Sequence, residues 1–290
     1  MEFQTFRAAD YEAVSSFLIE LCRRDDAHIH WNWARWAWMF EHPEFDKDAI
    51  GSIGLWREDG RVVGAAIYDM YFGEALCAAL PEHAALYPQI LDYAWRALRD
   101  GDGLAIAICE ENEAERAAAL ARGFLPEEQT ETVLSLTLNE PLAAELPAGL
   151  HLRELDQAAD AEALQWLYWQ GFDHGTDRAE FERAEQIVPR IRREFRRELS
   201  LAAADASGEP ISCCCLWYRD DTDYAYVEPV CTVPAWRRRG AAGALLREGL
   251  NRARALGAKR AVVISDQAFY FGLGFQTARR FRFYRKRETP

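Results

Sequence analysis

The alternation of apolar and polar residues predicts one succession of strands and helices that occurs twice along the chain. In the first half, apolar runs predict strands over 3–6, 52–56, 61–70, 76–80, 104–109 and 130–138. Helical spacing predicts helices over 11–22, 87–99 and 113–122. The dipeptide Asp59-Gly60 separates two of these strands and is typical of a two-residue hairpin turn.

The second half repeats this order. Strands are predicted over 150–153, 199–204, 211–218, 226–233, 261–265 and 281–285, and helices over 159–168, 180–199 and from 240 onward. The dipeptide Gly274-Phe275 mirrors Gly123-Phe124 of the first half. We therefore expect an internally duplicated α/β fold with a mixed sheet in each copy. The first domain would cover residues 1–140 and the second 150–290.

Charge is distributed unevenly between the halves. The 290 residues carry a net charge of −13; residues 1–145 hold 27 acidic and 11 basic side chains, and residues 146–290 hold 20 and 23. The first half is therefore at −16 and the second at +3. An acidic half would repel phosphates, which argues against a nucleic-acid partner, whereas the mildly basic half suits an anionic cofactor.

The sequence shows neither a membrane span nor a secretion signal. No apolar run approaches the roughly 20 residues that a span needs, and the start lacks a basic region followed by an apolar one. The seven cysteines show no metal-type spacing, and the adjacent Cys213, Cys214 and Cys215 would point to alternate faces of a strand. We expect reduced cysteines, no metal, no membrane contact and a cytoplasmic location.

Four tryptophans, Trp31, Trp33, Trp36 and Trp38, crowd one short segment. Packing is the simpler interpretation, because aromatic side chains bury large apolar areas. A lid or wall for an apolar or cationic substrate is the alternative.

The stretch from 226 to 246 carries the clearest chemical signal. Pro234 ends a strand, and the seven residues from Arg237 to Gly243 include three arginines and two glycines before a helix begins. The start of a helix leaves backbone N–H groups without partners, and glycine lets a phosphate approach the main chain closely. A solvated loop with turn glycines is the alternative.

The spacing of Arg237, Gly240 and Ala242 resembles the phosphate loop of the GNAT acetyltransferase superfamily. Residues 269–275 resemble the next signature of that family, a short helix with a tyrosine followed by Leu-Gly-Phe. Both motifs occur in the expected order. The resemblance covers about residues 150–287 and implies two tandem GNAT-like domains.

The resemblance implies that the second domain uses acetyl-coenzyme A as co-substrate and acetylates an amine. The pyrophosphate would lie on the backbone amides of 238–243, and the pantetheine arm would pair with 231–233 like an added strand. Tyr270 would protonate the leaving thiolate. The residues assigned to the cofactor are Cys231, Thr232, Val233, Arg237, Arg238, Arg239, Gly240, Ala241, Ala242 and Gly243.

Glu228 is the candidate base, acting directly or through water. It lies on the strand that enters the phosphate loop, and strand alternation would place it on one face with Val230 and Thr232. The alternative is an exposed carboxylate or a structural partner of an arginine.

The first half lacks these groups. When the halves are aligned on Pro81 and Pro234, Tyr87 stands where Gly240 does, and Ala84 and Gln89 replace Arg237 and Ala242. Alignment on the Gly-Phe dipeptides puts Ala119 at the position of Tyr270. We expect a degenerate first copy and one cofactor site, in the second domain.

The sequence leaves the acceptor open. An acidic first half favours a cationic small-molecule amine. A protein lysine or N-terminal amine is an alternative, as is a non-catalytic tandem module that senses coenzyme A or binds a partner.

Overall fold

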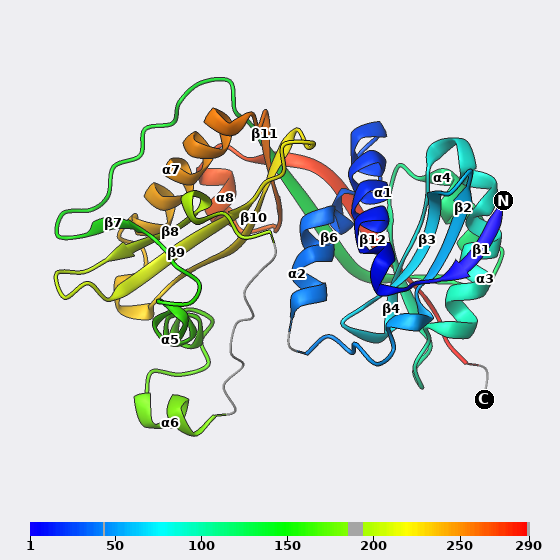
Figure 1. Ribbon diagram of the computed structural model, residues 1–290, viewed down its shortest axis with the longest axis horizontal. Helices are drawn as coiled ribbons and strands as arrows, with labels where there is room; N and C mark the ends of the chain where they lie inside the picture. The colour runs from blue at the N-terminus through cyan, green and yellow to red at the C-terminus, as the bar shows by residue number, and fades with distance from the viewer. Residues whose placement is uncertain (43, 185–193, 289–290) are drawn as a thin grey trace. The chain divides into compact units, whose positions relative to one another are not determined.

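The computed structural model describes residues 1–42, 44–184 and 194–288, which form two compact units of mixed α/β structure (Figure 1). Unit 1 comprises Met1–Leu134, Ile264–Ala268 and Thr277–Pro290. Unit 2 comprises Ser135–Val263 and Phe269–Gln276. The units are therefore not two consecutive blocks of sequence.

The sheet of unit 1 has the strand order β1-β2-β3-β4-β5-β12-β6. Strands β2 and β3 form the expected hairpin around Asp59-Gly60. The strand bounds are Glu2–Thr5 (β1), Gly54–Glu58 (β2), Arg61–Asp69 (β3), Tyr71–Ala79 (β4), Leu104–Cys109 (β5), Leu125–Thr137 (β6) and Gln276–Lys286 (β12).

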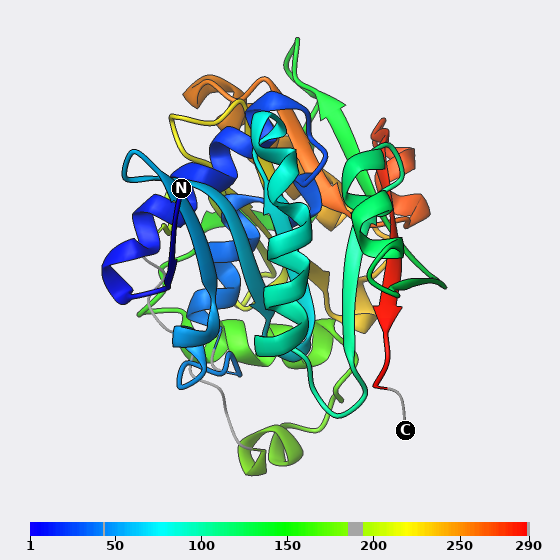
Figure 2. The ribbon, with the colours of Figure 1, turned by 90° about the vertical axis from the view of Figure 1, so that its right-hand side faces the viewer.

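Helices cover both faces of this sheet (Figure 1). Figure 2 shows α3 lying along the strands, where its residues Ile90, Leu91 and Ala94 are buried at helical spacing. The helix bounds are Tyr11–Arg24 (α1), Trp33–Glu41 (α2), Tyr87–Ala97 (α3) and Glu113–Leu120 (α4).

The tryptophan segment packs into the core of unit 1. Trp31, Trp33 and Trp36 are fully buried, and Trp36 stacks on Tyr11 with ring centroids 5.7 Å apart. Core packing is therefore confirmed for these three.

The sheet of unit 2 has the order β6-β11-β10-β9-β8-β7 and receives the end of β6 from Ser135 onward. Its strands β8 and β9 form an antiparallel hairpin. The strand bounds are His151–Glu154 (β7), Ser200–Ala204 (β8), Pro210–Trp217 (β9), Tyr224–Thr232 (β10) and Arg260–Ile264 (β11).

In the described part of unit 2, the helices are Ala161–Gly171 (α5), Arg178–Arg183 (α6), Ala241–Leu256 (α7) and Ala268–Gly272 (α8). The helix predicted over 180–199, with a break expected at Pro189, is present at 180–183 and absent from the later described residues. α6 ends at Arg183, because Ala184 adopts an extended conformation, and 197–199 form only a 3-10 turn. Residues 185–193 of that prediction lie outside the described residues.

The last strand of the chain, β12, belongs to the second half of the sequence but pairs with a strand of the first half. β12 lies antiparallel to β5, with Phe281 opposite Cys109 and Tyr284 opposite Ile106. Phe281 and Phe283 are buried there, so the pairing adds apolar core to unit 1.

The same turn ends the helix after the fifth strand of each copy. The backbone N–H of Phe124 donates to the carbonyl of Ala119, and that of Phe275 donates to Tyr270, each at 3.1 Å. Gly123 and Gly274 adopt left-handed φ values of 82° and 96°. The internal duplication is thus present in local geometry as well as in element order.

In the part of the chain that the structure describes, no helix has both the length and the apolar character needed to cross a membrane. All seven cysteines are buried, and none of them forms a disulfide.

Candidate active site

Strand β10 has an edge without a strand partner beside the predicted phosphate loop. On one side β10 pairs with β9 as far as Thr232. On the other side its parallel pairing with β11 stops where Tyr226 lies opposite Val262. Among the described strands, none continues that pairing toward Thr232. An extended ligand can therefore hydrogen-bond to this edge as an added strand.

A β-bulge interrupts β10 at Glu228. Val227 lies opposite Leu216 and Val230 opposite Cys214, so two residues of β10 face one residue of β9. Along this part of β10, Glu228, Val230 and Thr232 are half-buried and alternate with the more buried Pro229 and Cys231, as expected if the three share one face. Bulges of this kind reorient side chains next to active sites.

The segment after β10 presents a row of backbone donors. A 3-10 turn, Pro234–Trp236, leads to Arg238 at φ 59° and to Gly240 at φ 94°, after which α7 begins. Over the described residues, the N–H groups from Arg238 to Gly243 have no backbone acceptor, and the first intrahelical bond runs from Ala244 to Gly240. Six N–H groups at the positive end of a helix favour an anion.

Gly240 keeps the space beside these donors open. A Cβ added at Gly240 would have only the Pro147 side chain within 4 Å, at 3.8 Å. Its left-handed conformation is one that residues with a Cβ rarely adopt. Gly243 is buried, and an added Cβ there would lie 3.6 Å from Leu273.

Arg237 is not directed into this row of donors. Its Nε donates to the carbonyl of Thr232 at 3.0 Å, and its Nη2 donates to the carbonyl of Gly171 at 3.0 Å. The same Nη2 pairs with Asp173 at 2.8 Å. Its neighbours Arg238 and Arg239 are exposed, and the Arg239 guanidinium lies 4.9 Å from the ring centre of Trp236.

Tyr270 and Glu228 lie close enough to interact electrostatically. Tyr270 is 8% exposed on α8 and packs edge-on against Phe275. Burial raises the pKa of Tyr270 above its ordinary value, and Cys214 and Glu228 add to this rise. Tyr270 therefore stays protonated at neutral pH, as a proton donor must.

Comparison with known proteins matches this arrangement to a family. Residues 161–275 match the family model described as acetyltransferase (GNAT) family. These residues form a GNAT domain. They contain the β10 edge, the donors at the start of α7 and Tyr270.

The whole chain has the tandem GNAT fold. A tandem GNAT protein from the clavulanic acid biosynthesis pathway shares 16% identity over 100% of this chain and 99% of its own, with a TM-score of 0.63. A GCN5-related N-acetyltransferase from Sphaerobacter thermophilus shares 18% over 100% and 96%, with a TM-score of 0.60. A GNAT-family acetyltransferase from Colwellia psychrerythraea shares 12% over 99% and 100%, also at 0.60. No curated protein matches the chain.

In unit 1, a tyrosine side chain occupies the position equivalent to Gly240 of the GNAT domain. Tyr87 is the first residue of α3, and Gly240 directly precedes α7. The Tyr87 residue is only 4% exposed. Its hydroxyl lies 3.1 Å from His28 Nε2, accepts a hydrogen bond from Asn112 Nδ2 at 3.1 Å and also bonds the backbone of Ala79. Ala79 is the last residue of β4 and aligns with Thr232, the last residue of β10. The Tyr87 hydroxyl therefore contacts the end of the strand that is equivalent to β10.

The groups around Tyr87 are buried, which disfavours their charged forms. Burial lowers the pKa of His28 to about 4 and raises that of Glu115 well above its ordinary value. Glu115 accepts a hydrogen bond from Asn112 Nδ2 at 2.9 Å. Buried side chains that bond to one another therefore surround Tyr87.

One carboxyl group in unit 1 has a shifted pKa that could not be predicted from the sequence. Burial and the neighbouring carboxylate of Asp69 raise the pKa of Glu74 to about 7, against the opposing effect of Arg35. Glu74 lies on β4 where that strand meets β5, opposite Ala105. Only tertiary packing creates this environment.

Glu74 should make the protein less stable as pH rises. Its folded pKa of about 7 exceeds its ordinary value of 4.5, so between these pH values the folded protein holds a proton that the unfolded chain releases. Stability should fall less between pH 5 and pH 8 in Glu74→Gln than in wild type, by roughly 2.5 kcal/mol of unfolding free energy. Urea unfolding at both pH values measures this. The exposed Glu128→Gln is the control, and equal losses in Glu74→Gln and wild type would contradict the prediction.

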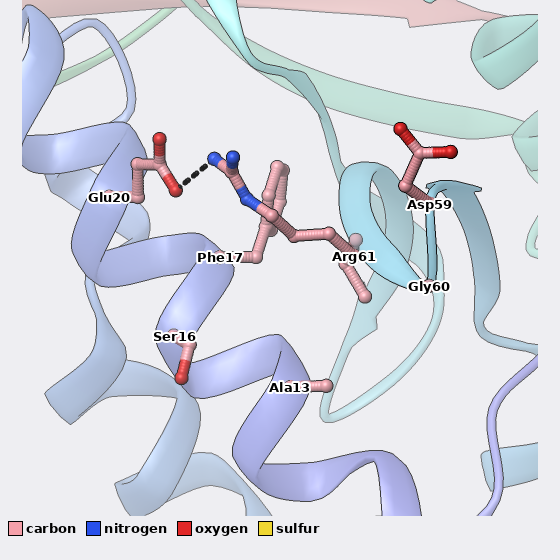
Figure 3. Close-up of a pocket in the computed structure, with 8 residues that line it drawn as sticks. Ala13, Ser16, Phe17, Glu20, Asp59, Gly60 and Arg61 are labelled. Atoms are coloured by element: carbon pink, nitrogen blue, oxygen red, sulfur yellow. Dashed lines mark hydrogen bonds and ion pairs between the residues drawn. The ribbon is translucent and has the colours of Figure 1, made fainter.

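Unit 1 also carries a surface hollow of about 370 Å³ between α1 and the β2–β3 hairpin (Figure 3). Glu20 and Arg61 form an ion pair across it. The hollow contains none of the residues of the GNAT-domain site. Its lining residues are Ala13, Ser16, Phe17, Glu20, Asp59, Gly60, Arg61 and Val62.

Proposed function

We propose that the GNAT domain binds acetyl-coenzyme A and transfers its acetyl group to an amine. The observation that carries this proposal is the row of N–H groups without backbone acceptors from Arg238 to Gly243, which continues from the free edge of β10. A pyrophosphate and an extended amide chain are the two ligand parts that such a row and such an edge recognise.

Two neighbouring stretches of main chain bind the two parts of acetyl-coenzyme A. The N–H groups of 238–243 hold the pyrophosphate, with the exposed Arg238 and Arg239 adding positive charge. The main chain of Cys231, Thr232 and Val233 pairs with the pantetheine arm. We assign this cofactor binding to the domain at 150–290 and none of it to the domain at 1–140, where Tyr87 is buried in the equivalent position.

Glu228 and Tyr270 supply the proton transfers. An amine with a pKa of about 10 is mostly charged at neutral pH, so Glu228 accepts its proton directly or through water. The amine nitrogen then bonds to the acetyl carbon, and a backbone N–H of β10 stabilises the negative charge on the carbonyl oxygen. The carbon–sulfur bond breaks, and Tyr270 donates its proton to the thiolate. The nitrogen loses its second proton as the amide forms, and this proton returns to the Tyr270 oxygen through water.

The acceptor we favour is a cationic small molecule. The first 145 residues carry a net charge of −16, which attracts a cation by long-range electrostatics. A lysine or an N-terminal amine of a protein carries the same charge, so an acceptor screen includes both.

An amine screen that reads free thiol tests this proposal. Wild type should release coenzyme A thiol with at least one cationic amine and acetyl-coenzyme A. Glu228→Gln should lower the rate of thiol release at pH 7 roughly 100-fold. The rate of this variant should recover in part above pH 9, where more of the amine is uncharged. Glu209→Gln, at an exposed carboxylate of the β8–β9 turn, is the control. A Glu228→Gln rate equal to wild type at pH 7 would reject the role of Glu228.

A further inference from the structure

Arg237 occupies the first position of the phosphate-loop motif, yet its guanidinium is held by protein acceptors. Three of its five N–H groups are used: Nε on the carbonyl of Thr232 and both hydrogens of Nη2 on Gly171 and Asp173. The Nε–Nη2 edge is one that a guanidinium uses for bidentate contact with a phosphate. In Arg237 that edge is occupied.

The acceptors of Arg237 come from two places far apart in sequence. Thr232 is the last residue of β10, whereas Gly171 ends α5 and Asp173 lies in the loop after it. Asp173 adopts a left-handed φ of 63°, which turns the chain at this point. Arg237 thus joins the loop after α5 to the end of the strand along which we place the pantetheine arm.

Close packing at Gly171 supports this connection. A Cβ added at Gly171 would lie 2.7 Å from Cys231 Sγ and 2.8 Å from its Cβ. The end of α5 therefore touches β10 at a residue assigned to the cofactor. A shift of residues 171–173 would therefore move the edge of β10 as well.

We propose that Arg237 is a positioning residue that fixes the 171–173 segment against the end of β10, and that it does not bind the pyrophosphate. The inference rests on the proposed function for its effect on ligands, but the connection itself exists without ligand. Arg237 holds the carbonyl of Thr232 and so sets the orientation of the peptide groups that receive the pantetheine arm. Arg238 and Arg239, which are exposed, remain for the phosphates.

Two ligands separate positioning from phosphate binding. Acetyl-pantetheine carries the thioester and the amide arm of acetyl-coenzyme A but lacks the pyrophosphate and the nucleotide. Arg237→Gln should weaken binding of both ligands by the same factor, about tenfold, as measured by thermal shift over a concentration series. Arg239→Gln should weaken acetyl-coenzyme A alone. A loss confined to acetyl-coenzyme A in Arg237→Gln would overturn the proposal.

Hydrogen exchange of the full chain without ligand provides an independent measurement. Amides of 171–174 should exchange at least tenfold faster in Arg237→Gln than in wild type, and Arg239→Gln should leave them unchanged. Asp173→Asn, which removes the ion pair but keeps both carbonyl bonds, should give a smaller increase. Unchanged exchange in Arg237→Gln would overturn the proposal even if ligand binding fell. If wild type binds neither ligand, the proposed function fails while this measurement still decides the role of Arg237.

Discussion

Replacing Tyr270 by phenylalanine should lower turnover at least 100-fold and leave the affinity for acetyl-coenzyme A nearly unchanged. The ring and its contact with Phe275 remain, so the variant loses only the hydroxyl proton. Loss of a general acid typically costs two to four orders of magnitude. Burial already raises the pKa of Tyr270, which keeps the proton available for the thiolate at neutral pH.

Tyr284→Phe is a matched control, since both tyrosines are 8% exposed. It should turn over at the wild-type rate. Steady-state kinetics with the best amine from the screen, together with thermal shift by acetyl-coenzyme A, separates chemistry from binding. Equal turnover in Tyr270→Phe and wild type would reject the role of Tyr270 as the acid.

Replacing Gly240 by valine should abolish the rise in melting temperature that acetyl-coenzyme A gives to wild type. A ligand at 100 times its Kd stabilises the folded state by about 2.7 kcal/mol, so the wild-type rise is readily measured. In the variant a branched side chain occupies the space beside the donors from Arg238 to Gly243. The left-handed φ of 94° adds backbone strain.

Gly208→Val separates the two effects. Gly208 lies in the β8–β9 turn at a φ of 87° with no atom within 4 Å of an added Cβ. Its valine variant should lose a similar amount of stability, about 1–2 kcal/mol, and keep the full response to acetyl-coenzyme A. A full response in Gly240→Val would show that the ligand does not approach this glycine.

Local sequence was sufficient for the segment from β10 to α7. Pro234 ends the pairing, Gly240 takes a left-handed conformation, and the apolar spacing of Leu245, Leu246 and Leu250 buries one face of α7. Each of these effects depends on residues near one another in the chain. The hairpin at Asp59-Gly60 was predictable for the same reason.

Features set by distant partners were not predictable. The bulge at Glu228 depends on the register with β9, and the pairing of β12 with β5 joins residues more than 170 positions apart. The Arg237 guanidinium donates to the carbonyls of Thr232 and Gly171, which lie far apart in the sequence, so its role could not be predicted from spacing. The raised pKa of Glu74 arises from burial and from Asp69, again through tertiary packing.

Calorimetric titration of the full chain with acetyl-coenzyme A tests most directly whether the two copies differ in cofactor binding. The GNAT domain offers open donors beside Gly240, whereas unit 1 holds buried Tyr87 at the equivalent position, hydrogen-bonded by Asn112. We therefore expect one binding site per chain, lost in Gly240→Val and retained in Tyr87→Phe. Two sites per chain, or binding that survives in Gly240→Val, would contradict the assignment of acetyl-coenzyme A to the start of α7.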